Sequence, residues 1–417
     1  MTGGRETGRG RRGLLATAAA ANKVAVILMG TVMAVYVERA GSVLAAGLVT
    51  TVYFFGLMVF SPVWGGIADV TGRHRLVLAV TSALAALSVL PLSVVGGAYA
   101  PLTFRFLFAV FAASFLPVGF TIVGEVSGGG GRGRAVGVFS AAGALGGALA
   151  QFSSGALLEL LARPTVYLAL FAIAALVAVA AAFVPDPIEP PSGSVSVEEL
   201  LGEIRRRLVP RADAAHLREH GLRWLYLASF LRNLTVLGFV TLLPVYFLRG
   251  VGTTPAVMGV LLGVNPLVQT VSMYGMGGLA DRIGRKPLIV AGYAGSGLYA
   301  LVEAVATVPG SPVARVLIAG VGMIVLGVSF AAVQVGVVSF IGDVAPTHRE
   351  SELVGLRWTA RGLGGMLAPP IFGTIVGLVG FEATFVLAST LAIAAAVIVF
   401  ALVTESFEGA STGRAAG

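Results

Sequence analysis

Long runs of apolar residues, separated by short polar stretches, form the main pattern of this chain. Each run is about 20 residues or longer, the length that an α-helix needs to cross roughly 30 Å of hydrocarbon. The apolar positions are continuous rather than alternating, so the pattern favours spanning helices over the strands of a membrane barrel. We expect twelve such helices, at residues 13–38, 43–67, 76–97, 101–124, 136–160, 165–184, 222–248, 255–280, 287–308, 312–341, 353–377 and 382–403.

The composition supports a polytopic membrane protein and narrows its chemistry. Hydrophobic residues make up 57% of the chain and charged residues 12%, about half the charged share of a soluble protein. The absence of cysteine excludes disulfides, thiol catalysis and cysteine-ligated metals, and the four histidines all lie outside the apolar runs. No phosphate-binding loop or catalytic constellation is present. We therefore expect no enzyme activity, no catalytic residues, no cofactor and no metal.

The distribution of basic residues indicates the orientation in the membrane. With the N-terminus placed in the cytoplasm, and with Arg223 at the cytoplasmic edge of the seventh span counted with the linker, 19 of the 28 Lys and Arg residues fall in cytoplasmic segments, three in outer loops and six within spans. This is the bias of the positive-inside rule, and it accounts for the net charge of +8 without invoking nucleic acid. We expect a multi-pass protein of the plasma membrane with both termini in the cytoplasm.

One long polar segment divides the chain, which gives expected domains at 1–184 and 222–417 with a cytoplasmic linker at 185–221. The linker opens with a proline-rich stretch that is hostile to helices. Farther on, apolar residues recur at helical spacing beside three consecutive arginines, which predicts an amphipathic helix on the inner leaflet that tethers the two halves. The apolar positions are Val197, Leu200, Leu201, Ile204 and Leu208, and the arginines are Arg205, Arg206 and Arg207.

The two halves repeat each other. The decapeptide GGIADVTGRH at 65–74 returns as GGLADRIGRK at 277–286, 212 positions later. The ends of the fourth and tenth spans also match, with Gly-Glu-Val at 124–126 and Gly-Asp-Val at 342–344. Two parallel halves related by an axis along the membrane normal are a known transporter design.

The decapeptides carry a resemblance to the major facilitator superfamily that covers essentially the whole chain. The loop signature of that family, G-x-x-x-D-R-x-G-R-K/R, is met in full at Gly277, Asp281, Arg282, Gly284, Arg285 and Lys286. The first copy keeps Gly65, Asp69, Gly72 and Arg73 but departs from the signature at Val70 and His74. The resemblance implies an all-α membrane fold of twelve helices in two pseudo-symmetric six-helix bundles. It also implies secondary transport by alternating access.

The charges of the repeat loops are candidates for a cytoplasmic gate. We predict two networks, Asp69–Arg73–Glu125 and Asp281–Arg285–Asp343, with Arg282 beside the second. The family resemblance implies that such clusters latch the cytoplasmic side shut in the outward-open state. The alternative is that these are solvated loop charges, because surface ion pairs contribute only about 0–1 kcal/mol.

The fourth span resembles a motif of proton-coupled drug exporters. Arg105 precedes the acidic residue Glu125 by 20 positions, and Pro117 lies between them. Ala109 stands where the motif has glycine. The resemblance implies a role for Arg105 in coupling protons to substrate; the alternative is an arginine near the outer interface.

Ionisable residues inside spans are functional candidates because they are expensive to bury. Those expected in the interior are cationic, whereas the acidic residues lie within a turn or two of a span end, and Arg315 and Arg357 are close enough to an end to snorkel. These cationic residues predict an electropositive cavity inside the protein. The candidate substrate-binding residues are Lys23, Arg105, Gln151, Arg232, Asn233, Asn265, Gln269, Gln334 and Arg361.

Two substrate classes fit this pattern. The exporter-like motif favours proton-coupled efflux of a drug or metabolite. The cationic interior favours an organic anion or a phosphorylated or carboxylated metabolite, moved by an exchanger or facilitator, and a sugar porter ranks third. The expected partners are a small-molecule substrate, the lipid bilayer and a coupling proton; we expect a monomer and no nucleic acid.

Overall fold

Helices make up the regular structure of the part of the chain that can be described. The computed structural model describes residues 3–126, 132–184, 186, 197–208, 220–344 and 350–406. The predicted all-α membrane fold is confirmed. Its elements are α1 (Gly3–Ala40), α2 (Val43–Thr71), α3 (His74–Leu87), the 3-10 helix η1 (Leu90–Ser93), α4 (Ala100–Ala112), α5 (Phe115–Val126), α6 (Arg132–Leu160), α7 (Arg163–Phe183), α8 (Val197–Leu208), α9 (Leu222–Tyr246), the π-helix η3 (Phe247–Val251), α10 (Pro255–Ile283), α11 (Arg285–Ala306), α12 (Pro312–Val344) and α13 (Glu350–Leu402).

The predicted spans correspond closely to these helices. Within the described residues, eleven helices are long and apolar enough to cross a membrane. The last of them, Thr359–Leu402, has 44 residues, about 66 Å of helix and so roughly twice the thickness of the hydrocarbon core. Gly380 interrupts it with φ 83° and ψ 174°, which divides it into the eleventh and twelfth predicted spans. The fourth predicted span contains α4 and α5 with a turn at 113–114 between them, and together they form one candidate membrane span.

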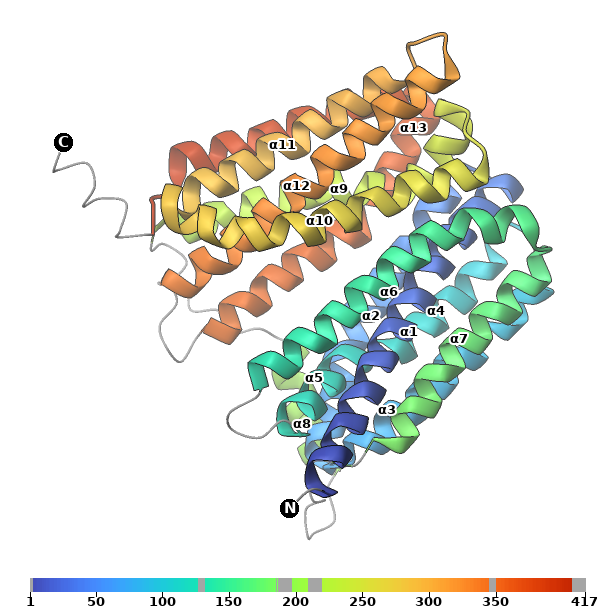
Figure 1. The fold of residues 1–417 in the computed structure, drawn as a ribbon, viewed down its shortest axis with the longest axis vertical. Coiled ribbons are helices and arrows are strands. Elements are labelled where there is room, and N and C mark those ends of the chain that lie inside the picture. Colours follow the sequence, from blue (N-terminus) through green and yellow to red (C-terminus); the bar gives the residue numbers. More distant parts are fainter. Residues whose placement is uncertain are drawn as a thin grey trace, which may run out of the picture. The chain divides into compact units, whose positions relative to one another are not determined.

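The chain forms two compact units. Unit 1 contains residues 1–41 and 52–210, and unit 2 contains residues 42–51 and 211–417. In unit 1, α1 packs against α6 and α7, and α3 packs against α7; in unit 2, α9 packs along α13, and α11 lies between α12 and α13. Figure 1 shows these helices running side by side within each unit, the first in blue to green and the second in yellow to red.

Small residues let the helices of each unit approach closely. In unit 1, a side chain at Gly146 of α6 would collide with the backbone of Ala20 in α1. In unit 2, Gly364 of α13 leaves room for Asn233 of α9 in the same way. Close approach at small residues is how helices associate in lipid, where there is no hydrophobic driving force between them. Gly146 lies in the fifth predicted span, and this close contact with α1 accounts for the glycine at that position.

The repeat loops are tight turns between consecutive helices. Gly72, between α2 and α3, has φ 66°, and Gly284, between α10 and α11, has φ 93°. Positive φ is strained for residues with a side chain and open to glycine. The linker contributes α8 to unit 1; the remainder of the predicted linker at 187–196 and 209–219, and the tail beyond 406, lie outside the described residues.

Candidate functional site

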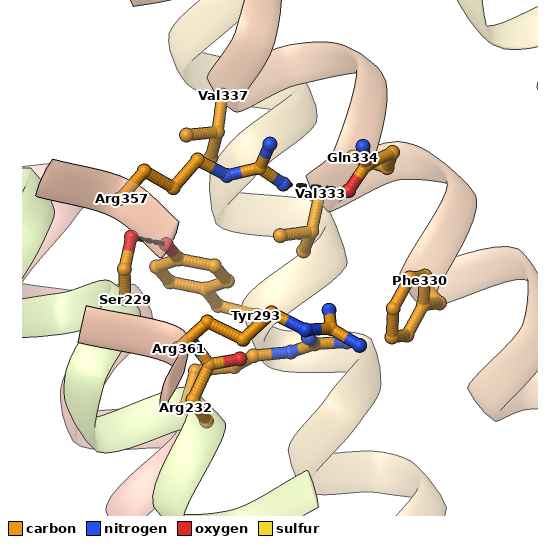
Figure 2. Close-up of a pocket in the computed structure, with 10 residues that line it drawn as sticks. Ser229, Arg232, Tyr293, Phe330, Val333, Gln334, Val337, Arg357 and Arg361 are labelled. Atoms are coloured by element: carbon orange, nitrogen blue, oxygen red, sulfur yellow. Dashed lines mark hydrogen bonds between the residues drawn. The ribbon is translucent and has the colours of Figure 1, made fainter. Parts of the chain in front are cut away.

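Four helices of unit 2 enclose a small cavity that is lined by three arginines. We call it the arginine pocket. Figure 2 shows its side chains converging from α9, α11, α12 and α13. The lining residues are Ser229, Arg232 and Asn233 from α9, Tyr293 from α11, Phe330, Val333, Gln334 and Val337 from α12, and Arg357 and Arg361 from α13.

Arg232 is the most deeply placed cation of the arginine pocket. Its side chain is 3% exposed, and its Nε donates to the hydroxyl of Ser296 at 3.2 Å. Its terminal Nη2 is buried and has no hydrogen-bond partner among the described residues. A buried guanidinium that lacks a partner costs several kcal/mol unless another group compensates, so this atom is placed to receive an acceptor from a ligand.

The other two arginines are held beside it by different contacts. The guanidinium carbons of Arg232 and Arg361 lie 4.9 Å and 5.4 Å from the centre of the Phe330 ring, distances at which a ring face attracts a cation. Arg357 donates from Nη2 to the side-chain oxygen of Gln334 at 2.6 Å, drawn as a dashed line in Figure 2. Three positive charges are thereby concentrated around one space.

The chemistry of the arginine pocket suits an anion. Of the lining residues that the structure describes, none is acidic. Two hydroxyl groups also line the pocket, those of Ser229 and Tyr293, and they form a hydrogen bond of 2.7 Å with each other. Guanidinium groups bind carboxylate and phosphate with paired hydrogen bonds. The cavity measures about 20 Å³, enough for about one water, so it fits a charged group of a substrate only after it widens.

The candidate residues of unit 1 form a separate set. Arg105 of α4 is 2% exposed, donates to the carbonyl of Val26 in α1 at 3.3 Å and lies 4.4 Å from the ring centre of Tyr53. Its Nε and Nη1 have no partner among the described residues. This deep position differs from the alternative of an arginine at the outer interface.

Lys23 and Gln151 are less enclosed than the sequence suggested. Lys23 is exposed, although its stem packs next to Gly143 of α6. Gln151 of α6 accepts a hydrogen bond from Thr31 of α1 at 3.1 Å. We predicted both Lys23 and Arg232 to be buried, but Lys23 is exposed, because a lysine stem can pack against a helix while its ammonium group reaches the surface.

Two further candidates lie on α10 and do not line the arginine pocket. Asn265 has a buried amide nitrogen without a partner among the described residues. Gln269, four positions later, is half-buried. They share one face of α10 because residues four apart are neighbours on a helix.

The second repeat loop brings three charged residues into contact. Nη1 of Arg285 lies 2.6 Å from Oδ1 of Asp281, and Nε lies 3.1 Å from Oδ2 of Asp343. Arg285 begins α11, Asp281 lies near the end of α10, and Asp343 lies near the end of α12. These are the contacts of the predicted second network, whereas Arg282 is exposed.

A carboxylate from beyond the last helix completes this cluster. Glu405 accepts the backbone N–H groups of Arg285 and Lys286 at 2.9 Å and 3.0 Å. The adjacent Ser406 donates to Asp343 at 3.1 Å. An anion at a helix N-terminus satisfies open donors and complements the helix dipole. Sequence reasoning missed Glu405, although its analogue after the sixth span, Asp186, accepts the N–H of Arg75 in unit 1.

The first repeat loop differs from the prediction. Asp69 does not pair with Arg73: among the described residues its partners are His74, at 2.9 Å, and Arg207 of α8, at 2.7 Å. Arg73 and Glu125 are exposed. The physical reason is local, because α3 begins at His74 and leaves Arg73 as its N-cap, whereas the repeat-related Arg285 is the first residue of α11.

The linker helix α8 supplies the arginine that binds Asp69. In the second loop Arg285 binds Asp281, whereas in the first loop Arg207 of α8, and not the repeat-related Arg73, binds Asp69. Arg207 also pairs with Glu203 at 2.7 Å. Burial opposes the charge of Arg207, but its hydrogen bonds to Glu203 and Asp69 outweigh that effect and raise its pKa.

Comparison with known proteins gives the family. The family model of the major facilitator superfamily matches residues 14–369 and 225–416. The chain belongs to the major facilitator superfamily. As a member of this superfamily it is a multi-pass membrane transporter and not an enzyme.

Relatives in this superfamily match part of the chain. The tetracycline resistance protein of class E from Escherichia coli is 29% identical over 133 residues, which cover 32% of this chain and 31% of that protein. The class C protein is 31% identical over 134 residues, with the same coverage. An uncharacterized MFS-type transporter of Methanocaldococcus jannaschii is 29% identical over 42% of this chain and 43% of its own. The matches to the tetracycline resistance proteins thus span about a third of their length.

Solved structures of the superfamily share the fold over nearly the whole chain. The nucleoside transporter NupG has a TM-score of 0.74 at 14% identity, covering 93% of this chain and 99% of its own. A bacterial homolog of the human lysosomal transporter Spinster, in an inward-facing and occupied conformation, has a TM-score of 0.73 at 14% identity, covering 93% and 95%. The D-xylose-proton symporter has 0.68 at 13%, covering 96% and 98%. At these identities the likeness shows the fold alone.

Proposed function

We propose that this transporter exports small organic molecules that carry a carboxylate or phosphate group, and that the arginine pocket holds that group. The observation that carries the proposal is Arg232, a buried arginine whose Nη2 lacks a partner among the described residues. Two further arginines of the pocket, Arg357 and Arg361, add to the attraction for an anion. Export is supported by the similarity to tetracycline resistance proteins.

Anion binding would link the pocket to transport through the helices that carry it. Arg232 belongs to α9, and Arg361 to α13. Without a ligand, the like charges of these two arginines repel each other. An anion between them offsets that repulsion, so it favours the conformation in which α9 and α13 hold it on both sides. A ligand shifts a conformational balance only through such a difference in affinity.

In this proposal the two repeat loops act as a gate on the cytoplasmic side of the plasma membrane. Arg285 holds the ends of α10 and α12 together through Asp281 and Asp343. In unit 1 the corresponding position is occupied by the pair of Asp69 and Arg207. Separation of these charges would accompany opening toward the cytoplasm, and closure would restore them.

The test is a thermal-shift measurement on the detergent-purified protein with four probes. These are benzoate, inorganic phosphate, tetraphenylphosphonium and glucose. Ligands that bind the folded state raise its stability, by about 2.7 kcal/mol at a concentration of 100 times Kd. We expect benzoate or phosphate to raise the midpoint in the wild type and not in Arg232→Gln.

The matched control is Arg39→Gln, which removes an exposed arginine at the end of α1 and should leave the shift unchanged. Stabilisation by tetraphenylphosphonium in both the wild type and Arg232→Gln would contradict the proposal and favour export of lipophilic cations. A shift with glucose alone would favour a sugar porter.

A further inference from the structure

A second buried ionisable residue of unit 2 lies outside the arginine pocket. Glu303 of α11 is 0% exposed, and both oxygens of its carboxyl group lack a hydrogen-bond partner among the described residues. The hydroxyl of Tyr246 donates to its backbone carbonyl, not to its carboxyl group. The nearby hydroxyl of Tyr299 is buried and also lacks a partner in the described part of the chain. The carboxyl group packs over Gly322 of α12, where any side chain would collide with it.

These surroundings require the carboxyl group of Glu303 to be in its neutral, protonated form. An ionised carboxylate in an apolar interior costs several kcal/mol unless a cation or several donors compensate. No cationic side chain of the described residues acts on Glu303. The titratable groups around it are Tyr246 of α9 and Tyr299 of α11, and Glu382 of α13 lies near Tyr246. None of them carries a positive charge, so Glu303 holds a proton in this conformation.

Tyr246, which binds the backbone of Glu303, leads into an irregular segment. Tyr246 ends α9 and is followed directly by the π-helix η3. Gly250 leaves room for the ring of Tyr246, and Thr253 returns to the carbonyl of Phe247 through a 2.9 Å hydrogen bond. Single π turns inside helices occur frequently at functional sites, because their hydrogen bonding is less regular.

The site is close to the end of its helix. α11 ends at Ala306, three residues after Glu303, a distance of about 5 Å along the helix axis. Thr307, the next residue, donates to the carboxylate of Glu382 at 2.9 Å. Glu303 therefore lies within one helical turn of the end of α11.

We propose that Glu303 is a reversible proton-binding site of unit 2, opened to water when Tyr246 and η3 move away from it. On opening, the O–H bond of the carboxyl group breaks, the proton passes to water and a hydrated carboxylate remains; on closure, the carboxylate takes a proton back. Proton binding stands on the geometry of Glu303 alone. Its use to drive export rests on the proposed function, for which it supplies the coupling group.

The test measures proton binding without any transported molecule. Proteoliposomes adsorbed on a solid-supported membrane are exposed to a step in external pH, and the transient current is recorded. We expect a current in the wild type that disappears in Glu303→Gln, because the amide mimics the neutral acid but binds no proton. The matched control is Glu382→Gln, a carboxylate that already has a donor in Thr307; its current should persist.

Correct folding of Glu303→Gln is checked by its gel-filtration profile and by its thermal midpoint. If that variant does not fold, the proposal is tested with Tyr246→Phe. This change removes only the hydroxyl that binds Tyr246 to the backbone carbonyl of Glu303, and the current should become faster. No current in the wild type, the full wild-type current in folded Glu303→Gln, or unchanged kinetics in Tyr246→Phe would overturn the proposal. A current that depends on Glu303 in a protein without anion-induced stabilisation would reject the proposed function and leave the proton site standing.

Discussion

At the scale of single residues, the carboxylate of Glu405 completes the first turn of α11. It accepts two backbone N–H groups, whereas Asp186 in unit 1 accepts one. We predict that Glu405→Gln lowers the stability of the protein by about 1 kcal/mol, the usual contribution of a capping hydrogen bond, because the two N–H groups bind different carboxylate oxygens and an amide offers only one acceptor oxygen and no charge for the helix dipole. The measurement is the thermal midpoint in detergent.

The control for this prediction is Asp186→Asn, which changes an exposed cap with a single donor. Its effect on the thermal midpoint should be smaller than that of Glu405→Gln. An equal or larger effect of Asp186→Asn would show that the two-donor contact of Glu405 is not what stabilises α11.

The residue scale also shows what the sequence could predict of the arginine pocket. Arg232, Gln334 and Arg361 were expected in the interior, and they line one cavity. Arg357 was expected to snorkel because of its place near a span end. The missed signal was its spacing from Arg361, since residues four apart lie on the same face of a helix. The buried Glu303 was missed for a similar reason, because nearness to a span end does not give the depth of a side chain.

At the scale of elements, α8 is tied to the cytoplasmic end of α2. Ile204 and the stem of Glu203 pack beside Gly66, and Arg207 reaches Asp69. We predict that Arg207→Gln loosens α8, because it removes the cation shared by Asp69 and Glu203. Hydrogen–deuterium exchange of the backbone amides of α8 should become faster in this variant.

The matched control for α8 is Arg205→Gln, an exposed arginine of the same helix, which should leave exchange unchanged. Equal acceleration in both variants would mean that charge in general, and not the pair with Asp69, holds α8. Hydrogen bonds from Arg206 and Arg207 lower the pKa of Glu203. Its contribution is therefore present above the ordinary glutamate pKa of about 4.3 and is lost as the pH falls through the lower pKa of the folded protein.

The sequence predicted the helices better than their local contacts. The apolar runs determined the spans, because only a helix satisfies its own backbone in lipid. The linker helix was expected at the membrane surface as a tether, yet α8 contacts the first repeat loop. Periodicity shows that a helix has an apolar face, but it does not show which surface covers that face.

At the scale of the whole molecule, two units with related sequences carry different interiors. Unit 2 holds the arginine pocket and Glu303, and unit 1 holds Arg105. The sequences of the loops between helices are similar in the two units, whereas their interior residues differ. We therefore assign the binding of the anionic group, and the proton site, to unit 2.

The central claim is that Arg232 binds the anionic group of a transported molecule, and a flux measurement tests it most directly. Proteoliposomes loaded with unlabelled benzoate are mixed with radiolabelled benzoate outside, and counterflow is followed in wild type, Arg232→Gln and Arg39→Gln. A charge-assisted hydrogen bond is worth about 1.5–3 kcal/mol, so we predict saturable counterflow that falls at least about tenfold in Arg232→Gln and persists in Arg39→Gln. Saturable counterflow of equal rate in all three proteins would contradict the account.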